Sequence, residues 1–164
     1  MESAPGANFN LMHFAAADGA GNAVLITNVG PPTTAGYRWV LFMSGSIAGE
    51  WRSSDISVAA RHHIAAVYDR TLTTNDPIIY VDGVSVTVTE IIAPVGILSG
   101  EDTIKIGEGL AGTGDWTGIM QHCVAAANTL WTAAEVNRAR WWGRPHGGIL
   151  VYHPLVTDKL VDEG

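Results

Sequence analysis

Short apolar segments recur along the chain and are separated by clusters of Gly, Pro, Asn and Asp. Such a pattern is typical of many short strands joined by turns, as in an antiparallel sandwich or barrel. Only one segment has the pattern of a helix. We therefore expect an all-β fold, a two-sheet antiparallel β-sandwich with one short C-terminal helix. The predicted strands span Phe9–Ala16, Ala23–Asn28, Tyr37–Met43, Ile56–Ala60, His63–Tyr68, Ile78–Val81, Val84–Glu90, Thr103–Gly107, Ile119–Ala126 and Ile149–His153.

The strongest local signal is a β-hairpin in the middle of the chain. Asp82 and Gly83 separate two apolar runs, and an Asp-Gly pair supplies the positive φ angles that a two-residue type I′ turn requires. The first strand, Ile78–Val81, is apolar at every position, as expected near the centre of a sheet. In the second strand, Val84–Glu90, valines alternate with Ser and Thr, so we expect one buried face and one wet face.

The single predicted helix lies near the C-terminus. Thr132 and Glu135 have the spacing of a capping box, in which each side chain accepts a hydrogen bond from a free backbone N–H group of the other residue. A helix is expected from about Ala133 to about Trp142. It should end at Gly143, because glycine tolerates the left-handed conformation that commonly follows a helix.

The composition fits one compact folded domain. The chain has 164 residues, of which 47% are hydrophobic and 15% are charged. Nine Lys and Arg against sixteen Asp and Glu give a formal net charge of −7, which disfavours a nucleic-acid partner because phosphate binding needs positive charge. The single cysteine, Cys123, cannot form an internal disulfide bond and is expected to act as a small buried hydrophobe.

The sequence contains no signal for membrane insertion or export. No apolar run reaches the roughly 18 residues of a membrane span, so we expect no membrane partner. The first residues, Met1–Gly6, lack the basic and apolar regions of a signal peptide. We therefore expect a protein that is made in the cytoplasm.

Several motifs occur in an order that resembles one known family. They are His62-His63-Ile64-Ala65, Tyr80-Val81-Asp82-Gly83, Lys105-Ile106-Gly107, Trp116-Thr117-Gly118-Ile119 and Thr132-Ala133-Ala134-Glu135. This succession is similar to the laminin-G-like jelly-roll domains of the concanavalin A-like lectin/glucanase superfamily. The resemblance covers about Phe9 to Gly143. It implies a concanavalin A-like jelly roll over 9–143, an N-terminal arm over 1–8, and a C-terminal extension over 144–164 with a possible edge strand.

The segment from Trp142 to Leu155 is similar to the tail that follows this domain in bacteriophage-encoded members, which implies association with a virion. The opening strand of the family has no counterpart before Phe9, which predicts an uncovered sheet edge. The C-terminal third also carries more apolar residues than one helix and one strand need. We therefore expect self-association or attachment to other virion or surface proteins. The candidate assembly residues are Trp141, Trp142, Leu150, Tyr152 and Leu155.

The chain lacks a recognisable catalytic pattern. His62 and His63 are adjacent, so on a strand they point to opposite faces and cannot hold one metal ion together. Glycoside hydrolases need two carboxyl groups fixed across the sugar. The nearest acidic pair, Glu108 and Asp115, lies in a Gly-rich loop that suits such fixed geometry poorly. We expect no enzymatic activity.

Two places could bind a sugar, because an exposed aromatic ring stacks on a sugar face while polar neighbours orient it. Trp51 lies beside Arg52, and Trp116 lies beside Asp115. The alternative for each tryptophan is a place in the core, where most large aromatic side chains of a β-sandwich lie.

A calcium site is the only cofactor that the sequence brings into consideration, and it is implied by the family resemblance. The candidate ligands are the acidic residues that fall in predicted turns, whose oxygens suit Ca²⁺. For Asp82, the needs of the turn are a sufficient alternative explanation. The candidates are Asp69, Asp82, Glu108 and Asp115.

Three functions remain, in order of preference. The first is a non-catalytic structural, decorating or adhesion subunit of a virion or other surface assembly. The second is a glycan-binding, lectin-like module. The third is a diverged glycoside hydrolase, which depends on the implied fold alone.

Overall fold

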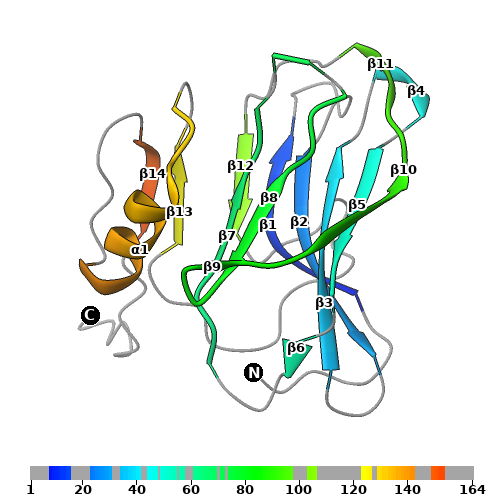
Figure 1. Ribbon diagram of the computed structural model, residues 1–164. Helices are drawn as coiled ribbons and strands as arrows, with labels where there is room; N and C mark the ends of the chain where they lie inside the picture. Colours follow the sequence, from blue (N-terminus) through cyan, green and yellow to red (C-terminus); the bar gives the residue numbers. More distant parts are fainter. Residues whose placement is uncertain are drawn as a thin grey trace, which may run out of the picture.

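The computed structural model describes residues 8–15, 23–30, 34–41, 44–47, 49–54, 56–57, 61–69, 71–72, 74–97, 103–106, 123–126, 129–142 and 149–153 (Figure 1). These residues form antiparallel strands in four sheets and one short helix. The described part of the chain is therefore mostly β-structure, as expected, and is compatible with an all-β sandwich.

The largest sheet contains β1 (Asn8–Ala15), β2 (Ala23–Gly30), β3 (Thr34–Leu41), β5 (Gly49–Ser53), β6 (Ile56–Ser57), β10 (Val88–Ile92) and β12 (Thr103–Ile106). Its order is β10-β5-β3-β2-β1-β12, and β6 pairs with β3 outside this path. The strands β2 and β3 pair along their whole length, from Ala23 opposite Leu41 to Gly30 opposite Thr34. The long N-terminal strands thus form the middle of the sheet.

The N-terminal strand does not leave an open sheet edge. On one side β1 pairs with β2, and on the other side it pairs with β12, where Met12 lies opposite Ile106. The expectation of an uncovered edge at this strand is therefore wrong. The sequence could not show this, because the pairing of β1 with β12 joins segments that are far apart in the chain.

A second sheet has three strands in the order β7-β8-β9, namely Ile64–Val67 (β7), Ile78–Val81 (β8) and Val84–Ser85 (β9). The predicted hairpin is confirmed, since β8 pairs with β9 across the turn at Asp82 and Gly83. Both turn residues have positive φ angles, 52° and 80°, as the type I′ turn requires. The strand β8 lies in the middle of this sheet, in agreement with its continuous apolar sequence.

The second hairpin strand is shorter than expected. It ends at Ser85, and the chain then passes to the seven-stranded sheet, where β10 begins at Val88. Val84 is 67% exposed, so the prediction that it belongs to a buried face is wrong. A β-sandwich makes such a corner when a strand moves from one sheet to the other.

Two further sheets have two strands each. One pairs Ser44–Ile47 (β4) with Val95–Ile97 (β11), and the other pairs Cys123–Ala126 (β13) with Ile149–His153 (β14). The C-terminal segment is therefore a strand, as predicted, and its partner is a strand of the same chain. The strands β4, β5 and β11 had not been predicted.

The helix α1 spans Ala133–Trp142, as the sequence predicts. Its capping box is confirmed: the backbone N–H of Thr132 donates to Glu135 Oε2 over 2.7 Å, and the backbone N–H of Glu135 donates to Thr132 Oγ1 over 3.4 Å. These bonds satisfy donors that the first turn of a helix leaves without partners.

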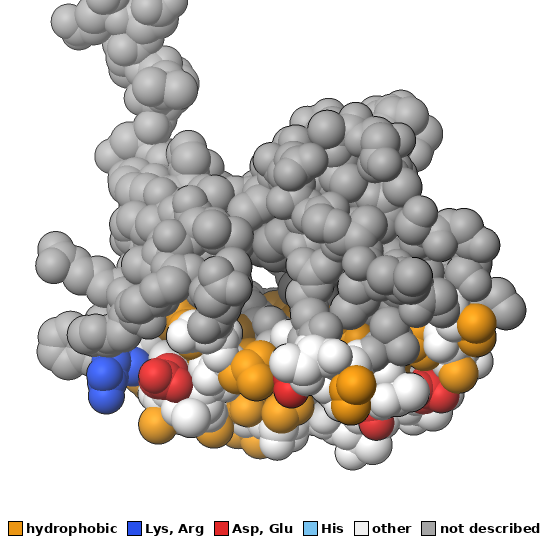
Figure 2. Space-filling view, turned by 90° about the horizontal axis from the view of Figure 1, so that it is seen from above, with side chains coloured by type: hydrophobic (Ala, Val, Ile, Leu, Met, Phe, Trp, Pro, Cys, Tyr) orange, Lys and Arg blue, Asp and Glu red, His pale blue; other side chains and the backbone are white. Residues whose placement is uncertain are grey.

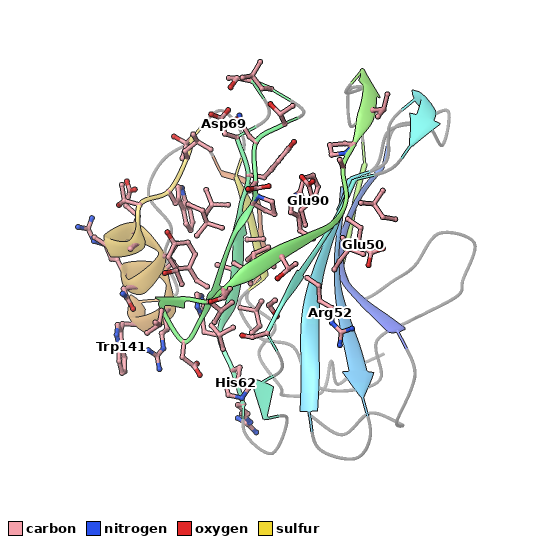
Figure 3. The ribbon with its side chains drawn as sticks, turned by 45° about the vertical axis from the view of Figure 1, so that its right-hand side comes forward. Glu50, Arg52, His62, Asp69, Glu90 and Trp141 are labelled. Carbon is pink, nitrogen blue, oxygen red and sulfur yellow. The ribbon has the colours of Figure 1, made fainter. Side chains whose placement is uncertain are left out.

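The described core lies between the seven-stranded sheet and the β7–β9 sheet and continues toward α1. Figure 3 shows these three elements as successive layers, with α1 on the far side of the β7–β9 sheet. Consecutive residues of β8 are buried on both of its faces, which such layering requires. The buried apolar side chains are Trp51, Ile79, Tyr80, Val81 and Val136.

Candidate functional site

The densest polar cluster among the described residues surrounds the hairpin turn at Asp82. Its carboxylate accepts a hydrogen bond from the backbone N–H of His63 over 3.0 Å and one from Nδ1 of His62 over 2.6 Å. A carboxylate can only accept, so Nδ1 of His62 must carry the proton. In return, the backbone N–H of Asp82 donates to the carbonyl oxygen of His63 over 2.8 Å. The turn is thus bound to the residues that precede β7.

The helix holds the same turn from the other side. Arg140 Nη1 donates to the carbonyl oxygen of Asp82, and Arg140 Nη2 lies 3.7 Å from Asp82 Oδ1. Asn137 Nδ2 donates to the carbonyl oxygen of Gly83 over 3.2 Å. Two side chains of α1, those of Asn137 and Arg140, therefore bind the hairpin turn, and we call this contact the turn–helix junction.

Gly83 is required at this junction for two reasons. Its φ angle of 80° lies in the left-handed region, which residues with a side chain rarely adopt. A Cβ atom at this position would also lie 1.8 Å from Oδ1 of Asn137. Both the turn and the close approach of the helix therefore require a residue without a side chain at this position.

The electrostatics of the junction favour a charged Asp82 and a neutral His63. Burial raises the pKa of Asp82, but the hydrogen bonds from His63 and His62 and the nearby charges of His62 and Arg140 outweigh it, so the pKa is lowered overall. For His63, burial lowers the pKa and Arg140 lowers it further, against the opposing effect of Asp82. His63 is half-buried, and the buried Nδ1 atom of its ring has no hydrogen-bond partner within the described residues.

The junction is suited to holding structure together. The negative charge of Asp82 is already matched by Arg140 and by the donors of His62 and His63. A carboxylate whose oxygens face hydrogen-bond donors is poorly placed to receive a cation as well. This geometry supports the turn-chemistry explanation of Asp82 over its assignment as a calcium ligand.

The other described calcium candidate, Asp69, lies at the opposite end of β7. Ile64 of β7 is paired with Val81, next to Asp82, whereas Val67 at the other end of β7 precedes Asp69. Four strand residues separate the two ends by about 10 Å or more. Asp69 and Asp82 are therefore too far apart to bind one ion together, and the calcium site stays a prediction.

Asp69 caps its own loop. Its Oδ1 accepts a hydrogen bond from the backbone N–H of Thr71 over 2.9 Å, and this bond lowers the pKa of the carboxyl group. No group of three or more His, Cys, Asp or Glu side chains with metal-binding geometry occurs among the described residues. The candidates Glu108 and Asp115 lie outside the described residues.

Trp51 is a core residue. Its side chain has an exposed fraction of 0%, its Nε1 donates to Asp76 Oδ1 over 2.7 Å, and its ring lies 6.0 Å from that of Tyr68, centroid to centroid. A ring without exposed surface cannot stack on a sugar from solution. The prediction of Trp51 as a sugar-binding residue is therefore wrong, and its alternative, a place in the core, is correct.

Arg52 cannot share a site with Trp51 either. The two residues are neighbours in β5, where the buried positions are Gly49, Trp51 and Ser53, while Glu50 and Arg52 are half-buried. Alternate residues of a strand face opposite sides of its sheet. Figure 3 shows Glu50 and Arg52 along this strand.

Of the other candidates for binding and assembly, only Trp141 has a described side chain. It is 74% exposed, and the guanidinium carbon of Arg140 lies 4.9 Å from the centre of its ring. Trp142 ends α1, and Leu150 and Tyr152 belong to β14, without described side chains. Asp115, Trp116 and Leu155 lie outside the described residues, so their predicted roles stay predictions.

The sequence analysis missed three residues that the structure brings into polar contacts. Asn137 and Arg140 hold the hairpin turn, and Asp76 accepts the hydrogen bond of Trp51. The only signal for Arg140 was its place in the last turn of a helix, where cations are favoured in any protein, and Asn137 had no such signal. No local pattern could have connected them to a turn more than fifty residues earlier.

Comparisons with known proteins give no match to this chain, whether against models of protein families, curated proteins or solved structures. Within the described residues, no helix has the length and the apolar character needed to cross a membrane.

Proposed function

We propose that this chain is a non-catalytic structural or adhesion subunit of a surface assembly such as a virion, built on a lectin-like, concanavalin A-like β-sandwich. The motifs at the His62-His63 pair, at the hairpin and at the capping box support the fold assignment, because they occur in the order that the laminin-G-like family shares. The succession of antiparallel sheets and the position of α1 are compatible with it.

The main support for the proposed assembly function is that many large apolar side chains are exposed on the described surface. Soluble monomers rarely expose extended apolar patches, and larger ones mark interaction sites. Here the exposed residues lie in the loop between β7 and β8, in the hairpin, in the edge strand β10, in β11, in the segment before α1 and in α1. They are Leu72, Ile78, Val84, Ile91, Ile92, Val95, Leu130 and Trp141.

The use of the polar groups supports the same function. The carboxylates of Asp82 and Asp76 and the guanidinium group of Arg140 bind turns, a helix and a buried indole. Groups that are engaged in this way stabilise the fold and leave little for acid–base chemistry. An assembly subunit needs a stable scaffold with an adhesive surface, and these residues supply the scaffold.

Static light scattering of the purified chain over a wide concentration range tests the proposal. We expect the weight-average mass to rise above that of the 17.4 kDa monomer as concentration increases. A mass that stays at the monomer value at every concentration, together with tight binding to a defined sugar on a glycan array, would favour the lectin-like alternative.

A further inference from the structure

Within the part of the chain that the structure describes, α1 is held by polar side chains and one apolar residue. Asn137 donates a hydrogen bond to the hairpin turn, and so does Arg140. Among the residues of α1 whose side chains are described, only Val136 is buried. A helix of ten residues is marginally stable in water on its own, so α1 depends on this docking. Loss of the contacts should therefore release and unfold the helix as one unit.

Two buried polar atoms close to α1 have no hydrogen-bond partner within the described residues, namely Nδ1 of His63 and Nε1 of Trp131. Trp131 directly precedes the capping residue Thr132. Burial and then the nearby charge of Arg140 lower the pKa of His63, so Arg140 lies close to that ring. A buried polar group without a partner costs free energy, which is recovered when water reaches the group. These two atoms therefore lower the free energy of opening at α1.

The side of the β7–β9 sheet that is turned to α1 carries Tyr80. On the other side, Trp51 of the seven-stranded sheet contacts Tyr68 at the end of β7. Ala66 precedes Tyr68 by two residues and is paired with Ile79, so Ile79 faces the seven-stranded sheet. Tyr80 is the next residue and therefore lies on the opposite face, where Figure 3 shows α1. Its exposed fraction is only 5%.

The helix lies at the margin of the described structure. Figure 1 shows it outside the β7–β9 sheet, and Figure 2 shows Lys and Arg side chains at the same end of the described surface. The strands β2 and β3, in contrast, pair along their whole length in the middle of the large sheet. Units with few buried contacts open locally, whereas core strands open only when the whole protein unfolds. The helix has the features of a unit that opens locally.

We propose that α1 is a strap that opens as one unit while the seven-stranded sheet and the β7–β9 sheet stay folded, and that its opening uncovers the face of β8 that carries Tyr80. Opening breaks the bonds from Asn137 and Arg140 to the hairpin turn and withdraws Val136 from the core. In the closed form α1 keeps this face from any partner. The strap concerns the motion of one element and does not depend on the proposed assembly function.

Hydrogen–deuterium exchange of the full chain, read by peptide mass at several urea concentrations below the unfolding transition, tests the strap. After correction for intrinsic rates, the amides of α1 should exchange together and at least tenfold faster than those of β2 and β3. Their rate should also depend less on urea, because a local opening exposes less surface than global unfolding. Equal rates and urea dependence in α1 and in β2 and β3 would overturn the strap. Exchange confined to the last turn of α1 would show fraying and would overturn it as well.

A matched pair of variants assigns the contact that closes the strap. Arg140→Gln and Arg138→Gln each remove one positive charge from the same helix, but only Arg140 is bonded to the hairpin turn in the structure, whereas Arg138 is exposed. Arg140→Gln should raise the exchange rate of all α1 amides about two- to tenfold, the effect of one lost hydrogen bond. Arg138→Gln should change it less than twofold. Equal effects of the two variants would contradict closure by Arg140.

Thiol labelling shows whether the buried side of α1 becomes accessible. Val136→Cys replaces a fully buried side chain by a thiol, and peptide masses distinguish its label from one on the native Cys123. The thiol should be labelled at the rate at which the α1 amides exchange, and faster when Arg140→Gln is added. Labelling that occurs only with global unfolding would overturn the strap. Such a failure leaves the assembly function standing, and a chain that light scattering finds monomeric leaves the strap standing.

Discussion

Two regions of this molecule join elements that are distant in the sequence, and they do so by opposite means. The turn–helix junction connects α1 to the β7–β9 sheet through directional polar contacts at Asp82 and Gly83. The Trp51 region connects β5 to the segments that flank β7 and β8 by enclosing one large ring, with a single hydrogen bond to Asp76. Stability should therefore depend at the junction on single polar atoms and on charge. In the Trp51 region it should depend on the volume of the buried side chain.

Each region also contains a glycine, and the reason for the glycine differs. Gly83 has a positive φ angle and approaches Asn137 closely. At Gly49, a Cβ atom would lie 2.7 Å from the six-membered ring of Trp51 and 2.9 Å from Cβ of Pro94. The first glycine is needed for backbone conformation and for docking of the helix. The second is needed for the space that the indole ring occupies.

Replacement of Trp51 should have the largest effect. Trp51→Ala removes the largest buried side chain of the described core, and truncation of a buried tryptophan costs about 3–5 kcal/mol. Urea denaturation followed by circular dichroism measures the loss. Asp76→Asn is the control, because it keeps an oxygen acceptor for the indole N–H and should cost much less. Equal losses in the two variants would show that the hydrogen bond dominates this region, and burial of the ring does not.

Gly83→Val should be the most damaging change at the turn–helix junction. A β-branched residue in the left-handed region costs about 1–3 kcal/mol, and the clash with Asn137 adds to this. The double variant Gly83→Val/Asn137→Ala removes the clash and keeps the backbone strain, so it should recover part of the stability. Thermal melting of the single and double variants gives the two contributions. If the Gly83→Val variant has the same melting temperature as the wild type, the turn does not need glycine.

The cap of α1 should contribute less. Thr132→Ala removes the hydroxyl that accepts the N–H of Glu135 and should cost about 1 kcal/mol, the usual value for a lost N-cap. Thr132→Ser keeps the hydroxyl and serves as the control. Urea denaturation of both variants measures the difference. If the alanine and serine variants have the same stability, the hydrogen bond from the Glu135 N–H to the hydroxyl of residue 132 contributes no more than a hydrogen bond to water.

The pH dependence should be the mildest effect, and its upper part should be specific to the junction. The pKa of His63 is lowered from 6.5 in the folded protein, chiefly by burial, so the unfolded chain binds this proton more readily. Stability is therefore full above pH 6.5 and falls as the pH decreases from there toward the lowered pKa. A second loss follows below pH 3.8, where the unfolded chain protonates Asp82 before the folded protein does.

Urea denaturation at a series of pH values measures both losses. In His63→Gln the decline that begins near pH 6.5 should become shallower, because residue 63 no longer titrates, while the decline at lower pH should persist. The backbone N–H that binds Asp82 remains in this variant. An unchanged decline in the upper range would assign it to another titrating group.

The hairpin and the helix were predictable because their signals are local. Asp-Gly at a two-residue turn and Thr132 with Glu135 at a helix start each act through neighbouring backbone groups, and the structure contains both. The strand β5 was missed because Gly49–Ser53 lacks β-branched residues. Its signal was a strict alternation, with Gly, Trp and Ser on the buried face and Glu and Arg between them.

By itself, the sequence determined the strand-rich class, the turn at Asp82 and Gly83 and both ends of α1, since these depend on backbone preferences and hydrogen bonds within a few residues. Only the tertiary structure decided that β12 covers β1, that Trp51 is buried and Trp141 exposed, and that Arg140 and Asn137 hold the hairpin turn. Composition alone cannot distinguish a buried tryptophan from an exposed one. Their burial depends on which layer lies over them, and that is set by strand pairing across long distances in the chain.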